Sequence, residues 1–137
     1  MLSTRDRQLI EELYSRYCWA NDAGDLQTWV DTFLESGVYD FNGQVFEGRK
    51  AIRTLFGERI AARPGQPIED PQHIISNLIV DGDAKGARGR CYFMRAVRAR
   101  GTGVISIETA GWFSDELRKV GGQWYFARRR VSRHIYG

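Results

Sequence analysis

The chain has 137 residues, of which 42% are hydrophobic and 12% aromatic, and its formal net charge is +3. This length and composition predict one folded domain over residues 1–137 and exclude an intrinsically disordered chain. The charge is mildly basic, but the three arginines at 128–130 would alternate faces in a strand and cannot form one basic patch. We therefore expect no nucleic-acid partner.

The sequence also argues against export and membrane insertion. The first residues of the chain are charged and lack the apolar segment of a signal peptide. No apolar run approaches the roughly 20 residues that cross a bilayer. Cys18 and Cys91 are the only cysteines, too few for a disulfide framework. We expect a cytoplasmic protein with no membrane partner.

The first predicted element is a helix. Apolar residues recur at helical spacing between Leu9 and Ala20. Ser3 or Thr4 is available as the N-cap, because a side-chain oxygen there can accept from a free backbone N–H. Gly24 follows as a C-cap glycine, so we expect the helix to end just before it.

A second, narrower apolar pattern predicts a second helix directly after the first. Asp25 is placed to cap it, and its apolar residues lie between Leu26 and Phe33. The sequence Glu-Ser-Gly at 35–37 is typical of a helix end. We therefore expect this helix to continue to about residue 34.

A β-hairpin and a third helix follow. Asn42-Gly43 is typical of a two-residue hairpin turn, with strands predicted at 38–41 and 44–46. The third helix is expected to begin after Gly48. It should stop before the proline- and glycine-containing stretch at 63–67.

The second half of the chain reads as strands joined by short turns. The predicted strands are His73–Val80, Ala84–Ala99, Val104–Arg118 and Gln123–His134. No helical pattern separates them, so they form antiparallel hairpins. Helices followed by such strands predict an α+β fold in which helices cover one face of a curved sheet.

Asp22 lies where the first predicted helix ends. A carboxylate at this position meets the negative end of the helix macrodipole, which is unfavourable. A residue that lies in an unfavourable electrostatic position is a candidate for a catalytic role. The alternative is that Asp22 only begins the turn at 22–25.

A lone histidine, His73, opens the first of the later strands. Histidine changes its charge near neutral pH and therefore suits a general base. In a regular strand the face that carries His73 also carries Ile75, Asn77 and Ile79. The alternative is that His73 is a core residue whose ring nitrogens form hydrogen bonds within the protein.

Several short motifs carry a resemblance to a known family. In chain order they are IEELYSRY at 10–17, DAGD at 22–25, WVDTF at 29–33, FEGR at 46–49, HIISN at 73–77 and GGQWYF at 121–126. Together they resemble the SnoaL-like branch of the nuclear-transport-factor-2-like superfamily over nearly the whole chain. The resemblance implies a cone-shaped α+β barrel with three N-terminal helices packed on a curved antiparallel sheet.

Within that superfamily, Asp22 and His73 are similar to the Asp-His dyad of scytalone dehydratase, lindane dehydrochlorinase and the bile-acid dehydratase. The resemblance implies that His73 is the general base and that Asp22 orients it. Tyr17 resembles a tyrosine of the bile-acid enzyme and would donate a hydrogen bond to a leaving oxygen or an enolate. Arg133 resembles an arginine of that enzyme and would bind a carboxylate or a carbonyl. The alternatives are that Tyr17 only packs and that Arg133 is structural.

The resemblance to scytalone dehydratase is incomplete. Ala110 stands where that enzyme has a second histidine, and Asn21 stands where it has a tyrosine beside the aspartate. These differences argue against its particular substrate and against a mechanism that needs two histidines.

Large side chains are expected to line a cavity for a small molecule. We expect the lining to include Trp19, Tyr39, Phe56, Tyr92, Met94 and Trp112. Glu108 is expected on the same face as a second carboxylate, and a β-bulge in its strand would alter that assignment. The two histidines are far apart without clustered acids, and no glycine-rich phosphate loop is present, so we predict neither a metal nor a cofactor.

The function predicted from these residues is a cofactor-independent lyase or isomerase of the dehydratase type. Its substrate would be a small apolar cyclic molecule, such as a steroid-like, polyketide or aromatic compound. One alternative is a non-catalytic accessory domain resembling the small subunit of a ring-hydroxylating dioxygenase. Another is a polyketide cyclase or hydrolase on the same fold. We also expect a homo-oligomer, either a trimer or a dimer.

Overall fold

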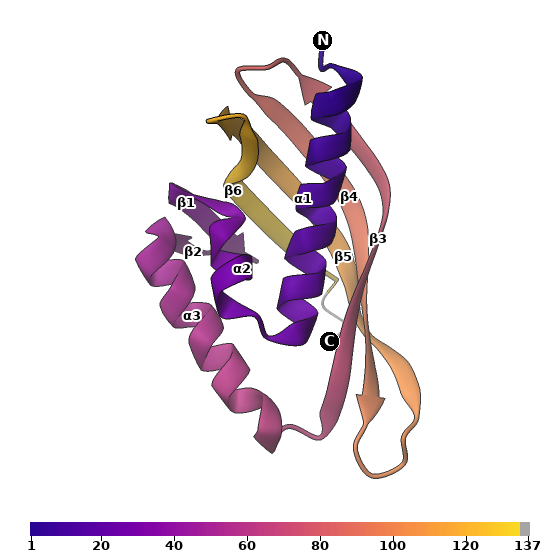
Figure 1. Ribbon diagram of the computed structural model, residues 1–137. Helices are drawn as coiled ribbons and strands as arrows, with labels where there is room; N and C mark the ends of the chain where they lie inside the picture. The colour runs from indigo at the N-terminus through magenta and orange to yellow at the C-terminus, as the bar shows by residue number, and fades with distance from the viewer. Residues whose placement is uncertain (135–137) are drawn as a thin grey trace.

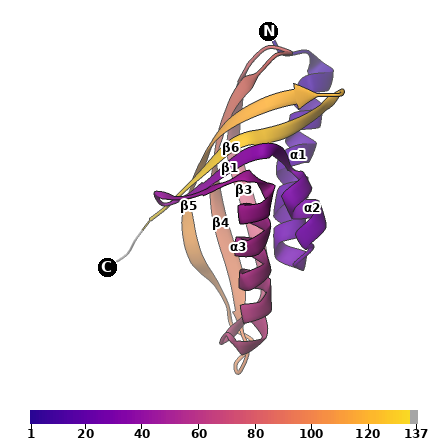
Figure 2. The ribbon, with the colours of Figure 1, turned by 90° about the vertical axis from the view of Figure 1, so that its left-hand side faces the viewer.

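The computed structural model describes residues 1–134 of the chain. The helices are α1 (Thr4–Ala23), α2 (Leu26–Asp31) and α3 (Gly48–Ala62), followed by a short 3₁₀ turn, η1 (Arg63–Gly65). The strands are β1 (Phe33–Phe41), β2 (Gln44–Glu47), β3 (Ile68–Gly82), β4 (Ala87–Ala99), β5 (Ile105–Val120) and β6 (Gln123–Arg133). The helices lie together on one side of a curved sheet (Figures 1 and 2).

The strands form one six-stranded sheet in the order β2-β1-β6-β5-β4-β3. Neighbouring strands pair antiparallel, except for β1 and β6, which run parallel. The parallel pair joins the N-terminal half of the chain to the last strand. The architecture is therefore α+β with helices on one face, as the order of elements predicted.

The capping residues of the first two helices are as predicted. Ser3 caps α1, and its hydroxyl accepts from the backbone N–H of Asp6 at 3.0 Å. Gly24 ends α1 in the left-handed region, with φ 71°. Asp25 caps α2 by accepting from the backbone N–H of Thr28 at 3.2 Å. Local chemistry alone determines these boundaries.

The predicted extent of the second helix is wrong. α2 ends at Asp31, and the stretch at 35–37 that was expected to end it lies inside β1. Phe33 is fully buried and pairs with Phe126 of β6, and the Phe126 N–H donates to the carbonyl of Thr32 at 2.8 Å. Pairing with β6, which lies nearly a hundred residues away in sequence, thus makes this segment part of the sheet.

The hairpin and the third helix are confirmed. Asn42 and Gly43 have φ values of 51° and 90°, as a two-residue turn of the primed type requires. α3 follows at Gly48 and ends before the proline-containing stretch, whose first residues form η1.

The four later strands are also confirmed, with shifted ends. β3 begins at Ile68 rather than His73, and β4 begins at Ala87 rather than Ala84. The turn between them is moved along the chain because Asp83 Oδ1 accepts from the backbone N–H of Lys85 at 2.8 Å.

The predicted alternation of β3 holds for only part of the strand. Asn77 has a φ of 59°, and the ladder with β4 shifts between Ser76 and Ile79. His73 and Ile75 are partly buried on the side of the helices, whereas Asn77 and Ile79 are exposed. The bulge reverses the alternation, so the four residues expected on one face do not share it.

Aromatic side chains fill the space between helices and sheet. Trp29 stacks on Phe56 of α3 with ring centroids 4.2 Å apart, and Tyr17 of α1 lies 5.4 Å from Trp29. On the sheet, Phe93 and Phe113 stack at 4.6 Å. These contacts fix α1 and α3 over the sheet on either side of the cavity described below.

The core also contains a charged group. Arg129 is fully buried and donates two hydrogen bonds to the carboxylate of Asp115, both at 2.8 Å, while the Tyr14 hydroxyl donates to the same carboxylate. Burial opposes the charge on Arg129, but Asp115 outweighs it and raises the pKa of Arg129 above its ordinary value. Arg128 and Arg130 face outward and pair with Asp40, so the three arginines alternate as predicted.

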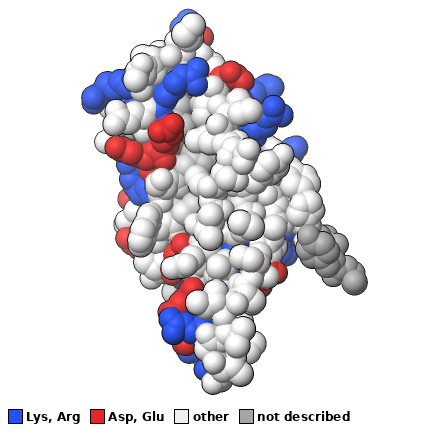
Figure 3. All heavy atoms as spheres, turned by 90° about the vertical axis from the view of Figure 1, so that its right-hand side faces the viewer, with Lys and Arg blue, Asp and Glu red and all other residues white. Residues whose placement is uncertain are grey.

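The other face of the sheet is not covered by helices. Figure 3 looks at the molecule from the β3 side, and a broad part of the surface there carries no Lys, Arg, Asp or Glu. Within residues 1–134, no helix combines the length and apolar character needed to cross a bilayer.

Candidate active site

The structure brings Asp22 and His73 into direct contact. Asp22 lies in the last turn of α1, and His73 lies on β3. The Asp22 Oδ1 atom is 2.5 Å from the His73 ring Nδ1, and Oδ2 accepts from the His73 backbone N–H at 2.9 Å. The two side chains are only 18% and 10% exposed. The pair is thus formed and largely withdrawn from water.

Arg63 compensates for the position of Asp22 at the negative end of α1. Its guanidinium Nη2 donates to the carbonyl of Asn21 at 2.7 Å, and Nη1 donates to the carbonyl of Asp22 at 3.3 Å. Carbonyls in the last turn of a helix have no partners within the helix. A cation that binds them stabilises the helix end and holds Asp22 in place.

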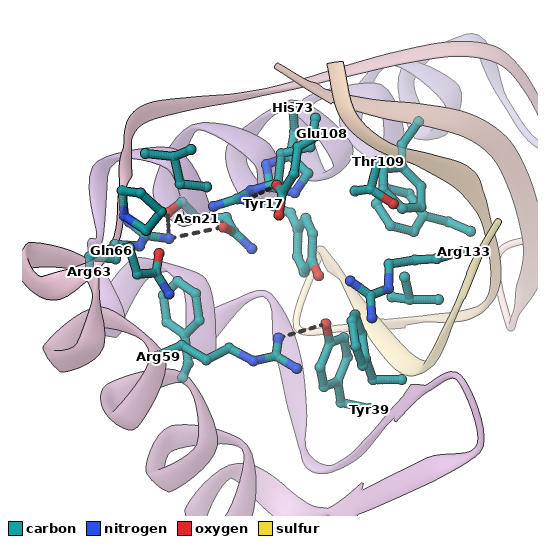
Figure 4. A pocket seen from close by; sticks show the side chains of 18 residues that line it. Tyr17, Asn21, Tyr39, Arg59, Arg63, Gln66, His73, Glu108, Thr109 and Arg133 are labelled. Atoms are coloured by element: carbon teal, nitrogen blue, oxygen red, sulfur yellow. Dashed lines mark hydrogen bonds and ion pairs between the residues drawn. The ribbon is translucent and has the colours of Figure 1, made fainter. Parts of the chain in front are cut away.

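A cavity of about 630 Å³ lies beside His73, between the helices and the sheet. Its apolar wall includes Phe56, Phe93 and Phe113. Polar side chains from several elements surround the cavity (Figure 4). Among the residues that line the cavity, those with polar or charged side chains are Tyr17, Asn21, Tyr39, Arg59, Arg63, Gln66, His73, Arg95, Glu108, Thr109 and Arg133.

Tyr17 reaches this cavity from α1. Its ring packs against the aromatic core, and its hydroxyl points into the open space (Figure 4). Burial, and then the neighbouring Tyr39, raises the pKa of Tyr17 well above its ordinary value. The phenol therefore stays protonated at neutral pH and is available as a hydrogen-bond donor. Tyr17 therefore both packs in the core and lines the cavity.

Glu108 faces the cavity because of a β-bulge. The pairing of β4 with β5 shifts at Arg95, so that the neighbouring residues Glu108 and Thr109 both line the space. Glu108 forms an ion pair with Arg95 across the two strands. Glu108 therefore lies at the cavity as expected, in a strand that contains the bulge.

The structure places several predicted site residues together and others elsewhere. Tyr17, Tyr39, His73, Glu108 and Arg133 line the cavity, as does Phe56, while Asp22 lies directly behind His73.

Four residues expected in the lining lie outside it. Trp19 is 78% exposed, because a shift of two positions along α1 turns it away from the face that carries Tyr17. Tyr92 and Met94 alternate with the buried Cys91 and Phe93, so they project from the outer face of β4.

Trp112 is the fourth of these residues. It lies opposite Tyr92 in the ladder between β4 and β5, and it is 39% exposed on the same outer face. The prediction of cavity lining for Trp19, Tyr92, Met94 and Trp112 is therefore wrong.

The sequence did hold a signal for two lining residues that were not predicted. Arg59 and Arg63 follow Phe56 at spacings of three and seven residues, which places all three on one face of a helix. Because Phe56 was expected in the cavity, the same spacing indicates that the two arginines lie beside it.

Within residues 1–134, no three side chains of His, Cys, Asp or Glu lie close enough together to hold a metal ion.

Comparisons with known proteins show the family to which the chain belongs. The SnoaL-like domain matches residues 3–130, whereas no curated protein matches the chain. A Nostoc punctiforme protein with a cystatin-like fold is 23% identical, with a TM-score of 0.81, over 97% of this chain and 94% of that one.

Two further solved structures are similar. A provisionally named scytalone dehydratase from Novosphingobium aromaticivorans is 23% identical over 94% of this chain and 84% of that one, with a TM-score of 0.79. ActVI-ORFA from Streptomyces coelicolor is 14% identical over 98% of this chain and 100% of that one, with a TM-score of 0.85.

At these identities the likenesses show the fold alone, and they confirm the predicted α+β fold of the nuclear-transport-factor-2-like type. The domain match extends over nearly the whole chain. The protein belongs to the SnoaL-like domain family.

Proposed function

We propose that this protein is a cofactor-independent lyase or isomerase of the dehydratase type, in which His73 removes a proton from carbon. The observation that carries the proposal is the contact of the Asp22 carboxylate with the His73 ring at the wall of a cavity of about 630 Å³. A cavity of this volume is within the range of small-molecule sites.

The hydrogen bond to Asp22 sets the role of each ring nitrogen. Nδ1 donates its proton to the carboxylate, so Nε2 keeps a lone pair and acts as the base. When Nε2 takes a proton from a substrate carbon, the ring becomes an imidazolium. The adjacent carboxylate stabilises that charge, as in a hydrolase triad.

The remaining steps use groups that face the same space. In a dehydration, the electron pair of the broken C–H bond forms the double bond as the C–O bond breaks. The departing hydroxide takes the proton from Nε2 and leaves as water. In an isomerisation the proton returns to a different carbon. The Tyr17 hydroxyl donates a hydrogen bond to the leaving oxygen or to an enolate oxygen.

The walls favour an apolar ring system as substrate. Phe56, Phe93 and Phe113 line the cavity, and their side chains carry no hydrogen-bonding groups. A fused cyclic ketone or β-hydroxyketone places an acidified C–H bond on a flat apolar body. This is the substrate class that we propose.

Hydrogen–deuterium exchange tests the proton abstraction without knowledge of the leaving group. Exchange of the α-protons of 2-tetralone in D₂O can be followed by proton NMR, with the rate in buffer subtracted. We expect the protein to accelerate the exchange and His73→Ala to reduce that acceleration by ~10²–10⁴-fold.

The only other histidine provides a matched control. His134 is exposed and does not line the cavity, so His134→Ala should leave the exchange rate unchanged. Exchange at the wild-type rate in His73→Ala, with an unchanged circular dichroism spectrum, would contradict the proposal. The cavity would then be a binding site alone.

A further inference from the structure

We propose that the end of the cavity opposite His73 binds an anionic group of the substrate, specifically a carboxylate, between Arg59 and Arg133. The inference rests on the proposed function only in assigning the same cavity to the substrate. It defines the substrate as an apolar ring system that carries a carboxylate at the end remote from the reacting carbon.

The two arginines come from separate elements and each lies against the same aromatic ring, Phe41. Arg59 projects from α3 and Arg133 from the end of β6. Their guanidinium carbons lie 4.5 Å and 4.4 Å from the centroid of the Phe41 ring. In Figure 4 both side chains point into the cavity near Tyr39, and His73 lies at the other end.

Neighbouring residues hold the guanidinium group of Arg59 and the backbone that carries Arg133. Arg59 Nη1 donates to the Tyr39 hydroxyl at 3.2 Å. The backbone N–H of Arg133 donates to the side-chain oxygen of Asn42 at 2.9 Å, so the β1–β2 turn fixes the end of β6. A cation site that is ordered before the ligand arrives loses less entropy on binding.

The other two arginines that line the cavity already bind groups of the protein. Arg63 binds the carbonyls at the end of α1, and Arg95 forms an ion pair with Glu108. Neither Arg59 nor Arg133 has a carboxylate within 4.0 Å among residues 1–134. Arg133 Nε is also buried with no hydrogen-bond partner among these residues.

Two like charges that face one partly dry space repel each other, and an anion placed between them removes the repulsion. The planar guanidinium group matches the two oxygens of a carboxylate and binds them through parallel hydrogen bonds. The apolar ring of Phe41, against which each group lies, limits their contact with water and strengthens the attraction. The arrangement therefore fits a carboxylate better than an uncharged carbonyl.

A pair of inert probes separates charge recognition from catalysis. 2-Anthracenecarboxylate and 2-anthracenecarboxamide share a fused apolar body and differ in charge, and neither carries a leaving group or an acidified C–H bond. Their affinities can be measured by isothermal titration calorimetry at low salt. We expect the carboxylate to bind the wild-type protein about tenfold or more tightly than the carboxamide.

Substitution of the arginines should remove only the preference for charge. Arg133→Gln and Arg59→Gln are each expected to weaken binding of the carboxylate by about tenfold, with little change for the carboxamide. Arg130→Gln is the matched control, because Arg130 lies on the same strand but faces outward toward Asp40. It should leave both affinities unchanged.

His73→Ala distinguishes this inference from the proposed function. That variant should lose proton exchange but keep its preference for the carboxylate, because the arginines lie at the other end of the cavity. Equal affinity of the two probes for the wild-type protein would overturn the inference. So would equal losses for both probes in the arginine variants, or no binding of either probe by the folded wild-type protein.

Discussion

The two oxygens of Asp22 bind two different parts of His73, the ring Nδ1 at 2.5 Å and the backbone N–H at 2.9 Å. The first contact sets the orientation of the imidazole. The second fixes the carboxylate to the strand that carries the imidazole. A rotation of either side chain breaks at least one of these contacts, so the pair is held rigidly at the wall of the cavity.

Asp22→Asn should therefore impair proton transfer more than its small change in shape implies. The amide keeps the volume of the carboxylate but loses the charge that stabilises an imidazolium, and it can accept at only one of its two terminal atoms. We expect the rate of 2-tetralone exchange to fall by ~10²-fold or more. Asp31→Asn, which alters an exposed acid on α2, should not change the rate. Full activity of Asp22→Asn would remove Asp22 from the mechanism.

Arg63→Ala is expected to destabilise the protein. The substitution leaves the carbonyls of Asn21 and Asp22 without their cationic partner at the end of α1. We expect the free energy of unfolding, measured in urea, to fall by about 1–3 kcal/mol. Arg53→Ala, on an exposed part of α3, is the control and should change it little. Equal stabilities of the two variants would be inconsistent with the capping role.

The buried Arg129–Asp115 pair makes a separate prediction about stability. Asp115→Asn leaves the Arg129 charge buried without a carboxylate partner among residues 1–134. We expect the free energy of unfolding to fall by about 3–5 kcal/mol. Tyr14→Phe removes only one hydrogen bond to Asp115 and should cost about 1–3 kcal/mol. If Asp115→Asn were the milder of the two, the charge would not be the dominant contribution.

The two cysteines predict how stability depends on alkaline pH. Burial raises the pKa of Cys18 to about 11 and that of Cys91 to about 12, although nearby Arg129 opposes both shifts. Below pH ~7 both thiols are protonated in the folded and unfolded states, and the unfolded state begins to lose these protons near its ordinary thiol pKa of about 8.5. As the pH rises toward 12, the unfolded state releases protons that the folded state keeps, so stability falls.

This contribution is at most about 1.4 kcal/mol per pH unit for each thiol. Urea unfolding at pH 8 and pH 10.5 should show the loss, and it should be smaller in a Cys18→Ala/Cys91→Ala double variant. An identical loss in the double variant would assign the effect to other groups.

The uncovered face of the sheet predicts self-association. Ile74, Tyr92, Met94 and Trp112 are 39–60% exposed, and cross-strand pairing places Ile74 opposite Met94 and Tyr92 opposite Trp112. A second copy of the chain offers the same uncharged surface, so we expect a homo-oligomer that buries this patch.

Trp112→Glu should shift the sedimentation coefficient toward that of a monomer. Trp19→Glu is the matched control, because Trp19 is also exposed but lies on α1. A wild-type protein that sediments as a monomer, or dissociation caused by Trp19→Glu instead, would contradict this interface.

Local signals in the sequence predicted the elements well. Gly24, Asp25 and Asn42-Gly43 act through their own backbone and side-chain chemistry, so their effects are independent of the rest of the chain. The end of the second helix was not predictable in this way. Phe33 joins the sheet because it pairs with β6, and no short stretch of sequence contains that information.

The lining of the cavity was harder to predict than the dyad. Large apolar residues alternate on both faces of β4, and only the position of the helices decides that Phe93 faces inward and Tyr92 outward. Glu108 depends in addition on a bulge that no local motif marks. Arg59 and Arg63, in contrast, could be placed by helical spacing once Phe56 was assigned to the cavity.

The bulge at Asn77 divides β3 into two halves with opposite parity. Without the bulge, a regular alternation over residues 73–80 would point His73 and Val80 to opposite faces of the sheet, because Val80 follows His73 by seven positions. The chain would have to sacrifice either its reactive imidazole or an anchor of its hydrophobic interior. The bulge therefore lets one strand hold His73 at the cavity and Val80 in the hydrophobic core.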